Sequence, residues 1–347
     1  MNARQPIHIA GGGLAGLTLG IALRQRDIPV VVYEAGSYPR HRVCGEFICG
    51  RGLEVLQALG LLEKLAAAGA RTAVTASFHS GQRDYRARIL PSPGLCLSRW
   101  AMDDLLAREF RRLGGELRER ERIGMAMAEP GWVRATGRRA ASEPAPAKWI
   151  GLKAHARKVS LAADLEMHFF PDGYVGLCRL PAGAVNVCGL FALRQPIPQL
   201  AAQWREILGG PAGSGLRERL RTAEFDSDSF STVTALNLAP AAGKPTIECS
   251  IGDALTMIPP VTGNGMSMAF ESAHWAAVPL AAYSRGELDW VAARQTIARQ
   301  CATGFARRLR WAAWFQRQLM HGSRRELLLR VGNCSDWLWR ICFAKTR

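Results

Sequence analysis

The stretch Ile7-His8-Ile9-Ala10-Gly11-Gly12-Gly13-Leu14-Ala15-Gly16, followed by the apolar run Leu17 to Leu23, decides how the rest of the chain is interpreted. The pattern predicts a buried strand, a tight turn and an amphipathic helix. Gly11, Gly13 and Gly16 have the spacing of a dinucleotide-binding fingerprint. The first glycine permits the turn, the second lets a pyrophosphate approach the backbone, and the third lets the helix pack on the strand.

A second strand and an acidic residue complete this pattern. Pro29 to Tyr33 is an apolar, β-branched run that ends at Glu34, eighteen residues after Gly16. An acid at about this distance holds the ribose hydroxyls in dinucleotide-binding βαβ units. The first helical residues, Leu14 and Ala15, would offer backbone N–H groups to the phosphates. The order of these features predicts a dinucleotide site; the alternative is an ordinary strand-to-helix turn with coincidental glycines.

Length and cysteine usage set broad limits. A chain of 347 residues suits one large domain or two entwined domains. Its nine cysteines are scattered without a CxxC pair, so neither zinc nor a disulfide framework is expected, and we predict no metal site. The first strand begins within a few residues of the N-terminus, and no run approaches the length of a membrane span. We therefore expect a cytoplasmic protein.

The net charge of +16 calls for an explanation. Arginines spread along helices, without a helix-turn-helix, RNA-recognition or zinc-finger signature, argue against nucleic acid as a partner. Half of the excess lies after residue 300, where ten basic residues oppose Glu326 and Asp336. Phe305 to Arg347 interleaves this charge with Trp311, Trp314, Phe315, Trp337 and Trp339. Such a helical segment either contacts an anionic membrane or forms a lid with solvated arginines.

Coarse patterning predicts the remaining elements. We expect Ser98 to cap a helix over residues 99–113, ended by Gly114-Gly115. Another helix is expected over 52–59 and one over 196–208. Strands are expected over 72–78, 83–90, 149–155, 165–170, 174–180 and 184–193, with a further strand over 226–238.

A second strand–loop–helix lies between Thr246 and Ala273. A strand-like run ends at Gly252-Asp253-Ala254, and Pro259 to Gly265 then precedes a helix that begins at Met266. Asp253 could accept hydrogen bonds from sugar-like hydroxyls. The Gly263-Asn264-Gly265 turn would aim backbone N–H groups at an electron-rich carbonyl edge, as a reduced flavin has. The alternative is an ordinary loop with a capping aspartate.

Together these motifs resemble the FAD-dependent oxidoreductases built like aromatic hydroxylases, the group A flavoprotein monooxygenases. The resemblance spans residues 7 to about 280. Within that group, Arg42-Val43-Cys44-Gly45-Glu46 and Phe170-Pro171-Asp172-Gly173-Tyr174 are most similar to the geranylgeranyl-reductase-related branch. The family implies FAD as the cofactor and NAD(P)H as its transient reductant.

The resemblance implies roles for individual residues. Gly11, Gly13 and Gly16 would face the pyrophosphate of FAD, and Glu34 would hold the adenosine ribose. Arg99, with Asp103 on the same helix face, resembles the arginine that braces FAD, and Arg42 lies in a loop that could reach FAD. Residues that would meet the ribityl chain and the isoalloxazine are Gly252, Asp253, Pro260, Gly263, Asn264, Gly265 and Met266.

One departure concerns the reductant. Hydroxylases of this group carry an Asp-Gly pair in a later strand–turn, and here Thr136-Gly137 stands in its place within a shortened region. This departure leaves open how NAD(P)H docks. The paired-tryptophan motif of the halogenase branch is absent, so halogenation is set aside.

Three residues are candidates for catalysis. The resemblance implies that Cys44 would lie near the substrate side of the flavin, where it is either a reactive thiol or an inert small residue. Lys153 and His155 lie two apart on an expected strand and would project from one face, where they could polarise or protonate a bound oxygen. The alternative for that pair is a solvated sheet face. His168 fits a packed histidine better than a catalyst.

We therefore expect an α/β fold: a Rossmann-like FAD-binding domain interrupted by a substrate domain with an antiparallel β-sheet, plus C-terminal helices. The expected boundaries are 1–70, 95–145 and 240–300 for the first domain, 71–94 and 146–239 for the second, and 301–347 for the helical segment. The function favoured is hydroxylation of a hydrophobic aromatic, polyketide-like or isoprenoid molecule. A reductase of carbon–carbon double bonds and a catalytically impaired flavin-binding protein are the alternatives. Substrate identity and oligomeric state stay open.

Overall fold

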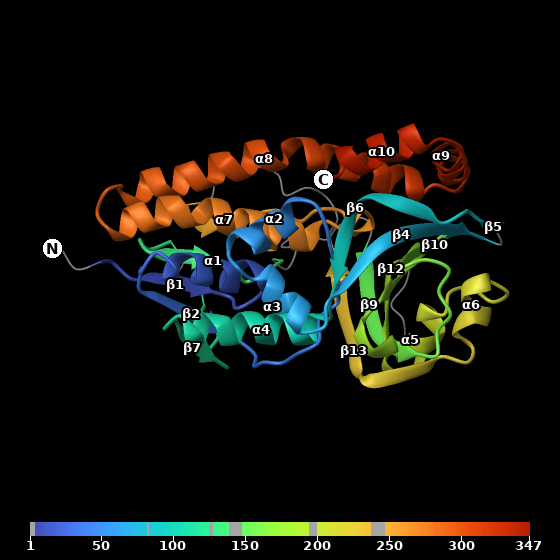
Figure 1. Ribbon diagram of the computed structural model, residues 1–347, viewed down its shortest axis with the longest axis horizontal. Helices are drawn as coiled ribbons and strands as arrows, with labels where there is room; N and C mark the ends of the chain where they lie inside the picture. The colour runs from blue at the N-terminus through green and yellow to red at the C-terminus, as the bar shows by residue number, and fades with distance from the viewer. Residues whose placement is uncertain (1–3, 82, 125–127, 139–147, 194–199, 237–246) are drawn as a thin grey trace.

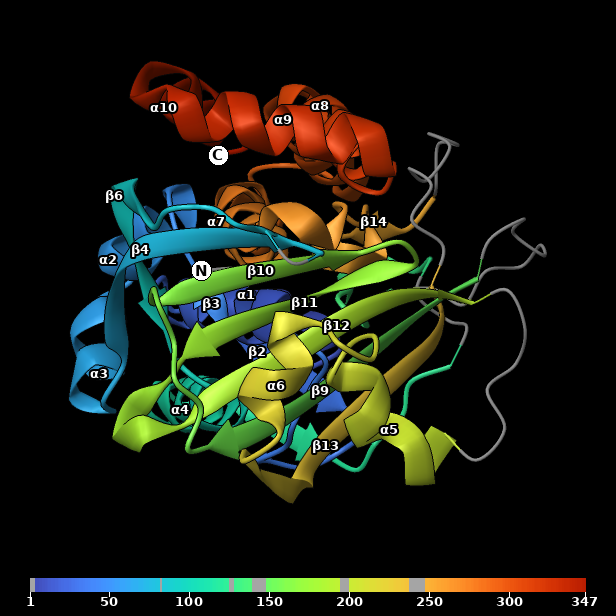
Figure 2. The same cartoon turned by 90° about the vertical axis from the view of Figure 1, so that its right-hand side faces the viewer.

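The protein is organised around two β-sheets that lie side by side, with long helices running along one side of both (Figure 1). This computed structural model describes residues 4–81, 83–124, 128–138, 148–193, 200–236 and 247–347. In the view of Figure 2 the larger sheet faces the reader, and the C-terminal helices lie above it.

The first sheet carries the glycine-rich turn and is parallel throughout. Its strands, in the order β14-β8-β1-β2-β7, are Cys249–Ser250, Trp132–Arg134, Ile7–Ala10, Val30–Glu34 and Glu116–Glu119. β1 is central because it pairs with β2 on one side and with β8 on the other. The turn therefore begins at the carboxyl end of the central strand, which is where open parallel sheets bind their ligands.

Helices cover this sheet. Helix α1 (Leu14–Arg24) is buried along nearly its whole length and packs against α4 (Arg99–Arg112) and α7 (Gly265–Ser284). Helices α2 (Arg51–Ala58) and α8 (Trp290–Leu319) pack on α7, and α3 (Leu62–Ala67) packs on α2. The predicted cap of α4 is confirmed, because the hydroxyl of Ser98 accepts a hydrogen bond from the backbone N–H of Ala101.

The second sheet has the strand order β13-β9-β12-β11-β10-β4-β6-β3, and β5 pairs with β4. In that order, with β5 last, the strands are Glu224–Leu236, Lys148–Arg157, Val185–Leu193, Gly173–Arg179, Leu165–Phe170, Arg71–Ser80, Arg88–Cys96, Phe47–Ile48 and Arg83–Asp84. All neighbours are antiparallel except β10 and β4, which are parallel. The sheet is thus mixed rather than purely antiparallel, because these two strands are far apart in sequence and no short turn dictates their direction.

Two details differ from the expected segments. Strand β3 lies within residues 1–70, which we assigned to the first domain, yet it pairs with β6 of the second sheet. The helix expected over 196–208 is α5 (Leu200–Leu208), whose expected first residues lie outside the described part of the chain. With α6 (Gly215–Leu220), α5 covers the outer face of the second sheet.

The C-terminal segment forms α9 (Gly322–Cys334) and α10 (Asp336–Lys345), which lie with the end of α8 over β4, β6 and α7 (Figures 1 and 2). A simple lid would have solvated arginines, but two arginines of this segment are buried. Arg308 forms a buried ion pair with Glu271 of α7 at 2.6 Å. The buried guanidinium of Arg325 donates to the hydroxyl of Ser80 and the carbonyl of Phe170, both at 2.9 Å. The segment is therefore anchored to helix α7 and to the second sheet.

The tryptophans of this segment divide into two groups. Trp311 and Trp339 are half-buried against the hydrophobic clusters beneath the helices. Trp314 and Trp337 are exposed, with 39% and 68% of their surface accessible. Within the described residues, no helix combines the length and the apolar character that crossing a bilayer requires.

The buried ion pair between α7 and α8 gives a test of this packing. Replacing Glu271 by Leu leaves the cation of Arg308 buried without its partner, which should lower the free energy of unfolding by about 3–5 kcal/mol. The double variant Glu271→Leu/Arg308→Met should recover most of that loss. The measurement is urea-induced unfolding at neutral pH.

The matched control is Glu224→Gln, which breaks a solvent-exposed pair with Lys158 and should change stability by less than about 1 kcal/mol. If Glu271→Leu is as mild as Glu224→Gln, the ion pair does not hold α8 on α7.

Candidate functional site

Steric contacts explain Gly11 and Gly16 of the first turn, whereas Gly13 faces open space. Gly11 has φ of 108°, and a Cβ atom there would lie 2.4 Å from the carbonyl oxygen of Ala135. A Cβ atom at Gly16 would lie 1.9 Å from the carbonyl oxygen of Gly11, so α1 can approach β1 only without a side chain. At Gly13 no described atom lies within 4 Å of the Cβ position, and no side chain caps α1. Gly13 therefore faces open space beside free N–H groups, an arrangement that binds phosphate.

The carboxylate of Glu34 is already extensively hydrogen-bonded. It accepts from the backbone N–H groups of Gly12 at 2.9 Å and Gly36 at 2.8 Å, and both of its oxygens accept from Arg40. Burial raises the pKa of Glu34, but the hydrogen bonds and charge of Arg40 outweigh burial and lower it to about 2. These contacts use about four lone-pair sites, so a ribose hydroxyl would replace one of them.

The second glycine segment meets the first turn directly. A Cβ atom at Gly252, in the 3-10 turn Gly252–Ala254, would lie 2.9 Å from the side chain of Ala15. The neighbouring Asp253 is accessible to solvent, yet protein atoms surround it enough to raise the pKa of its carboxyl group. The charges of Arg99 and Arg138 oppose this shift. Asp253 is therefore a recessed acceptor close to two cations.

The turn Gly263-Asn264-Gly265 leads from the 3-10 turn Pro260–Thr262 into α7. Gly263 has φ of 66° and lies beside the ring of Phe47. The side chain of Asn264 does not cap α7, because its amide donates to the backbone carbonyl of Thr346. The first N–H groups of α7 are thus free of side-chain caps, as they are in α1.

Three residues expected to touch the cofactor have buried side chains. Leu14, Ala15 and Met266 are 5%, 7% and 6% exposed, and they open α1 and α7. Only their backbone groups can face a ligand. Pro260, by contrast, is exposed.

Arg99 and Cys44 are neighbours in the structure. The guanidinium of Arg99 makes two hydrogen bonds to Asp103, at 2.7 and 2.8 Å. Burial raises the pKa of the Cys44 thiol, and the nearby charge of Arg99 offsets only part of that rise. The carbonyl of Cys44 accepts from the buried amide of Asn186 at 2.9 Å. Cys44 is therefore a neutral thiol held in a fixed loop.

A buried carboxylate, Glu46, organises the candidate catalytic residues. It accepts hydrogen bonds from the backbone N–H of Arg99 at 2.8 Å and from Nε2 of His155 at 2.7 Å, and Nζ of Lys153 lies 3.3 Å away. Lys153 also lies 3.1 Å from Nδ1 of His41. Burial and then the charge of Lys153 lower the pKa of His41 to about 4, so this imidazole is neutral at pH 7.

This network corrects one interpretation of the sequence. Lys153 and His155 do project to one side, but the solvated-face alternative is wrong for Lys153, whose side chain is fully buried. His155 keeps 13% of its side chain exposed. Both side chains end on Glu46 rather than on an open wall, and their catalytic role stays a prediction.

A second polar cluster lies on the opposite face of the larger sheet. His79, Glu166 and His168 are buried, and Nε2 of His168 donates to the carboxylate of Glu166 at 2.9 Å. The two imidazoles are stacked at 4.2 Å with an angle of 7° between their planes. Ring-nitrogen lone pairs lie in the ring planes, so parallel rings do not converge on one ion. Arg219 also pairs with Glu166. We interpret the cluster as a packed ion-pair network.

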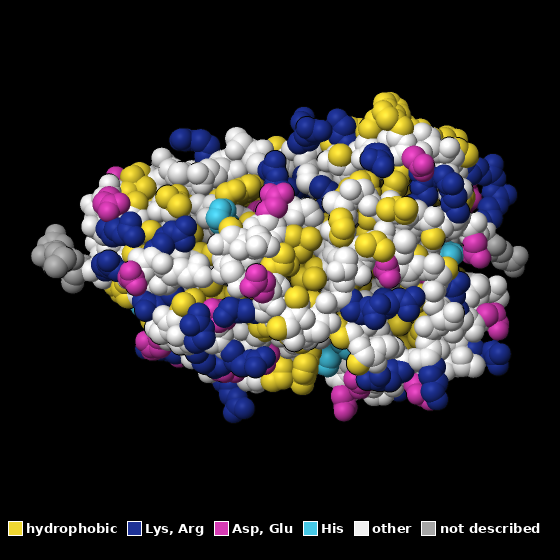
Figure 3. Space-filling view, viewed as in Figure 1, with side chains coloured by type: hydrophobic (Ala, Val, Ile, Leu, Met, Phe, Trp, Pro, Cys, Tyr) yellow, Lys and Arg dark blue, Asp and Glu magenta, His cyan; other side chains and the backbone are white. Residues whose placement is uncertain are grey.

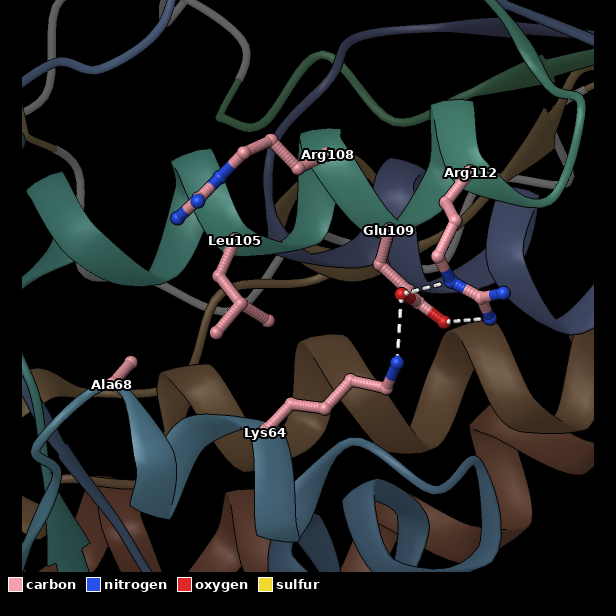
Figure 4. A pocket seen from close by; sticks show the side chains of 6 residues that line it. All are labelled: Lys64, Ala68, Leu105, Arg108, Glu109 and Arg112. Atoms are coloured by element: carbon pink, nitrogen blue, oxygen red, sulfur yellow. Dashed lines mark hydrogen bonds and ion pairs between the residues drawn. The ribbon is translucent and has the colours of Figure 1, made fainter.

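A surface groove lies between α3 and α4 (Figure 4). Lys64 and Arg112 point at Glu109, with Nζ of Lys64 3.0 Å from the carboxylate. Arg108 pairs with Asp104 at 3.0 Å. The groove is larger than the cavity described next, at about 520 Å³, but each of its basic side chains already pairs with a carboxylate. The ion pair between Lys64 and Glu109 therefore joins α3 to α4, and we do not interpret the groove as an anion site.

A cavity of about 160 Å³ lies where the larger sheet, the loop before Gly263 and the C-terminal helices meet. Val261 and Thr262 line it directly before Gly263. Most of its wall is apolar, and its polar residues include Asn333 and Arg347. The Oδ1 atom of Asn333 and the Nε atom of Arg347 are buried without a hydrogen-bond partner among the described residues. Two residues of the cavity wall thus each carry a buried polar atom without a hydrogen-bond partner among the described residues.

The residues present suit FAD. Two uncapped helix N-termini, a recessed carboxylate at Asp253 and an acid at Glu34 are the donors and acceptors that a flavin dinucleotide requires. Sequence reasoning missed Arg40 and Arg138, and it quoted Glu46 without giving it a role. The loop from Arg40 to Glu46 has two arginines and a single acid, Glu46. This pattern could have indicated that Glu46 forms ion pairs within the protein.

Comparison with known proteins supports the cofactor. Residues 4–150 match the family model described as FAD binding domain. No curated protein sequence matches the chain.

Solved structures share the fold across nearly the whole chain. Flavin-dependent brominase Bmp2 is 18% identical, with a TM-score of 0.70 over 96% of this chain and 94% of that chain. PqsL, a probable FAD-dependent monooxygenase from Pseudomonas aeruginosa, is 16% identical, with a TM-score of 0.68 over 93% and 98%. Halogenase PltM is 15% identical, with a TM-score of 0.71 over 92% and 76%. The chain therefore has the fold of flavin-dependent monooxygenases and halogenases, with an FAD-binding domain matched over residues 4–150.

Two glycines of the first turn should respond differently to substitution. Gly13→Ala adds a methyl group in open space, so it should keep the stability of the cofactor-free protein but lower FAD affinity by at least tenfold. Gly16→Ala forces the methyl group against the carbonyl of Gly11, so it should destabilise the cofactor-free protein itself. Thermal unfolding without FAD and fluorescence titration with FAD separate the two effects. Unchanged FAD affinity in Gly13→Ala would place the pyrophosphate elsewhere.

Proposed function

We propose that the protein is an FAD-dependent monooxygenase that hydroxylates a hydrophobic small molecule of aromatic, polyketide-like or isoprenoid type. NAD(P)H is the proposed transient reductant. The observation that carries the proposal is the apolar cavity beside the loop that leads to Gly263. It lies next to the turn whose free N–H groups suit a flavin ring.

The lining of the cavity supports the substrate class. Phe78, Phe315, Leu328 and Trp339 supply aromatic and aliphatic surface from four different elements. Ligand sites of this kind bind largely apolar molecules and orient them with a few polar groups. Here the buried Oδ1 atom of Asn333 and the buried Nε atom of Arg347, both without a partner among the described residues, would do so.

The protein's own residues divide the remaining work. FAD, when bound, supplies the redox chemistry. Glu34, Asp253 and the N-termini of α1 and α7 would hold it. Arg99 fixes the loop of Cys44 through Glu46, and it keeps a positive charge next to the cofactor site. The network of Glu46, Lys153 and His155 is the proposed source of exchangeable protons.

Two alternatives stay open. The Cys44-Gly45 motif resembles reductases of the geranylgeranyl-reductase-related branch, which favours saturation of carbon–carbon double bonds. Thr136 replaces the acid usual in hydroxylases, and it is exposed after β8. If that change abolishes reduction by NAD(P)H, the protein is a flavin-binding protein without turnover.

Reaction with and without oxygen separates these functions. The purified protein should be yellow, and acid should release FAD rather than FMN. With a suitable apolar substrate, NAD(P)H consumption should require oxygen and give a hydroxylated product. Anaerobic consumption with a saturated product would favour the reductase. Protein that holds FAD but consumes no NAD(P)H with any candidate would favour the flavin-binding protein, and colourless protein that cannot be reconstituted would exclude all three.

Filling the cavity tests the location of the substrate. Leu328→Trp places a larger side chain in the cavity from α9, so it should abolish substrate-stimulated NAD(P)H consumption while FAD content stays unchanged. Leu327→Trp is the matched control, because Leu327 is exposed on the same helix. Product assays with both variants provide the measurement. Normal turnover in Leu328→Trp, with its fold intact, would place the substrate outside this cavity.

A further inference from the structure

We propose that the outer side of helices α9 and α10 is a docking surface for an anionic lipid membrane. Membrane contact by the C-terminal segment was one of two expectations from the sequence. The structure now separates the side chains that face inward from those that face solvent. The inference rests on exposed residues and does not require the proposed function.

Helix α9 has apolar residues on two sides. On its inner side, Leu328 and Leu329 line the cavity and Arg325 is buried. On its outer side, Leu327 and Val331 are 65% and 43% exposed. These two residues are four apart and therefore share one face of the helix. No contact within the described structure accounts for an apolar outer face.

Helix α10 continues this surface. Trp337 is 68% exposed at its start. Tryptophan combines a large apolar ring with one N–H donor, and this combination favours the boundary between lipid and water. Figure 3 shows hydrophobic side chains mixed with Lys and Arg over the region of α9 and α10.

Positive charge surrounds these side chains. Three exposed arginines of α9 and α10 have no ion-pair partner among the described residues: Arg324, Arg330 and Arg340. Each lies three or four positions from Leu327 or Trp337 and so shares a helix face with it. Three further exposed arginines, Arg307, Arg310 and Arg317, lie on the neighbouring α8. The two acids of the segment are engaged by the second sheet. Glu326 accepts from Ser80 and Tyr85, and Asp336 pairs with Arg88. The outer side therefore carries a local excess of positive charge.

This combination favours lipid over other polyanions and over a second copy of the chain. A nucleic acid would use the arginines but leave Leu327, Val331 and Trp337 in water. A second copy would bring like charges together. An anionic bilayer attracts the arginines and also buries the apolar side chains in its interface. Since the inner side of α9 lines the cavity, docking would bring that cavity close to lipid-dissolved molecules.

Vesicle flotation tests the proposal with the full-length protein. The vesicles contain phosphatidylcholine alone or phosphatidylcholine with phosphatidylglycerol. We expect flotation only with the anionic vesicles, weakened at high salt because exposed charges are screened. Each arginine near the surface contributes roughly fivefold, so Arg324→Gln/Arg330→Gln/Arg340→Gln should weaken binding by on the order of a hundredfold. Leu327→Ser/Val331→Ser should weaken the part of binding that survives high salt.

Matched controls separate local docking from the attraction of a basic protein as a whole. Arg71→Gln/Arg120→Gln/Arg122→Gln removes the same charge from exposed positions outside the segment, and Val278→Ser/Val291→Ser removes apolar side chains that are 62% and 52% exposed. Both controls should float like the unmodified protein. Equal losses in control and tail variants, or no flotation of the unmodified protein with anionic vesicles at low salt, would overturn the proposal. Circular dichroism checks that each variant is folded.

Discussion

The carboxylate of Glu46 joins the two halves of the protein. It accepts from the first backbone N–H of α4, which packs on the parallel sheet, and from His155 of the second sheet, with Lys153 close by. Burial of a carboxylate is costly, so these partners are needed to keep it charged, and they hold its pKa below the usual value. Glu46 also has φ of 57°, a conformation that costs a non-glycine residue about 1 kcal/mol or more. The loop of Cys44 is thus fixed between the two sheets.

That constraint explains where the chemistry can occur. The loop from Arg40 to Glu46 is held at both ends. Arg40 binds Glu34, the acid of the dinucleotide motif, and Glu46 binds His155 of the second sheet. The charge of Arg99 acts on both Cys44 and Asp253, so the loop and the second glycine segment are electrostatically linked. The cavity lies beyond Gly263, on the side covered by the C-terminal helices. Cofactor residues come mainly from strand and helix ends, whereas the cavity wall comes from elements that are distant in sequence.

This difference decides how much the sequence could predict. The glycine turn, the cap at Ser98 and strand 165–170 follow from local patterns, and the structure has them at the expected residues. The parallel pairing of β10 with β4 and the partners of Glu46 depend on contacts between distant segments, which periodicity does not report. Lys153 illustrates the limit: its alternation on β9 predicted which way it points, but not that a carboxylate from another segment would bury it. The position of the cavity could not be predicted from the sequence either, because its wall combines residues of α8, α9 and α10 with residues of the second sheet.

The C-terminal segment cannot be treated as a removable cover. Arg308 of α8 forms an ion pair with Glu271 of α7, and Arg325 donates hydrogen bonds to the hydroxyl of Ser80 and the carbonyl of Phe170. Removing the segment would leave a buried carboxylate without its cation and would expose the apolar wall of the cavity. Loss of cofactor or of folding after truncation would therefore follow from either a lid or a docking surface. Only substitutions on the outer side, at residues such as Leu327 and Arg330, change the surface while leaving the buried contacts in place.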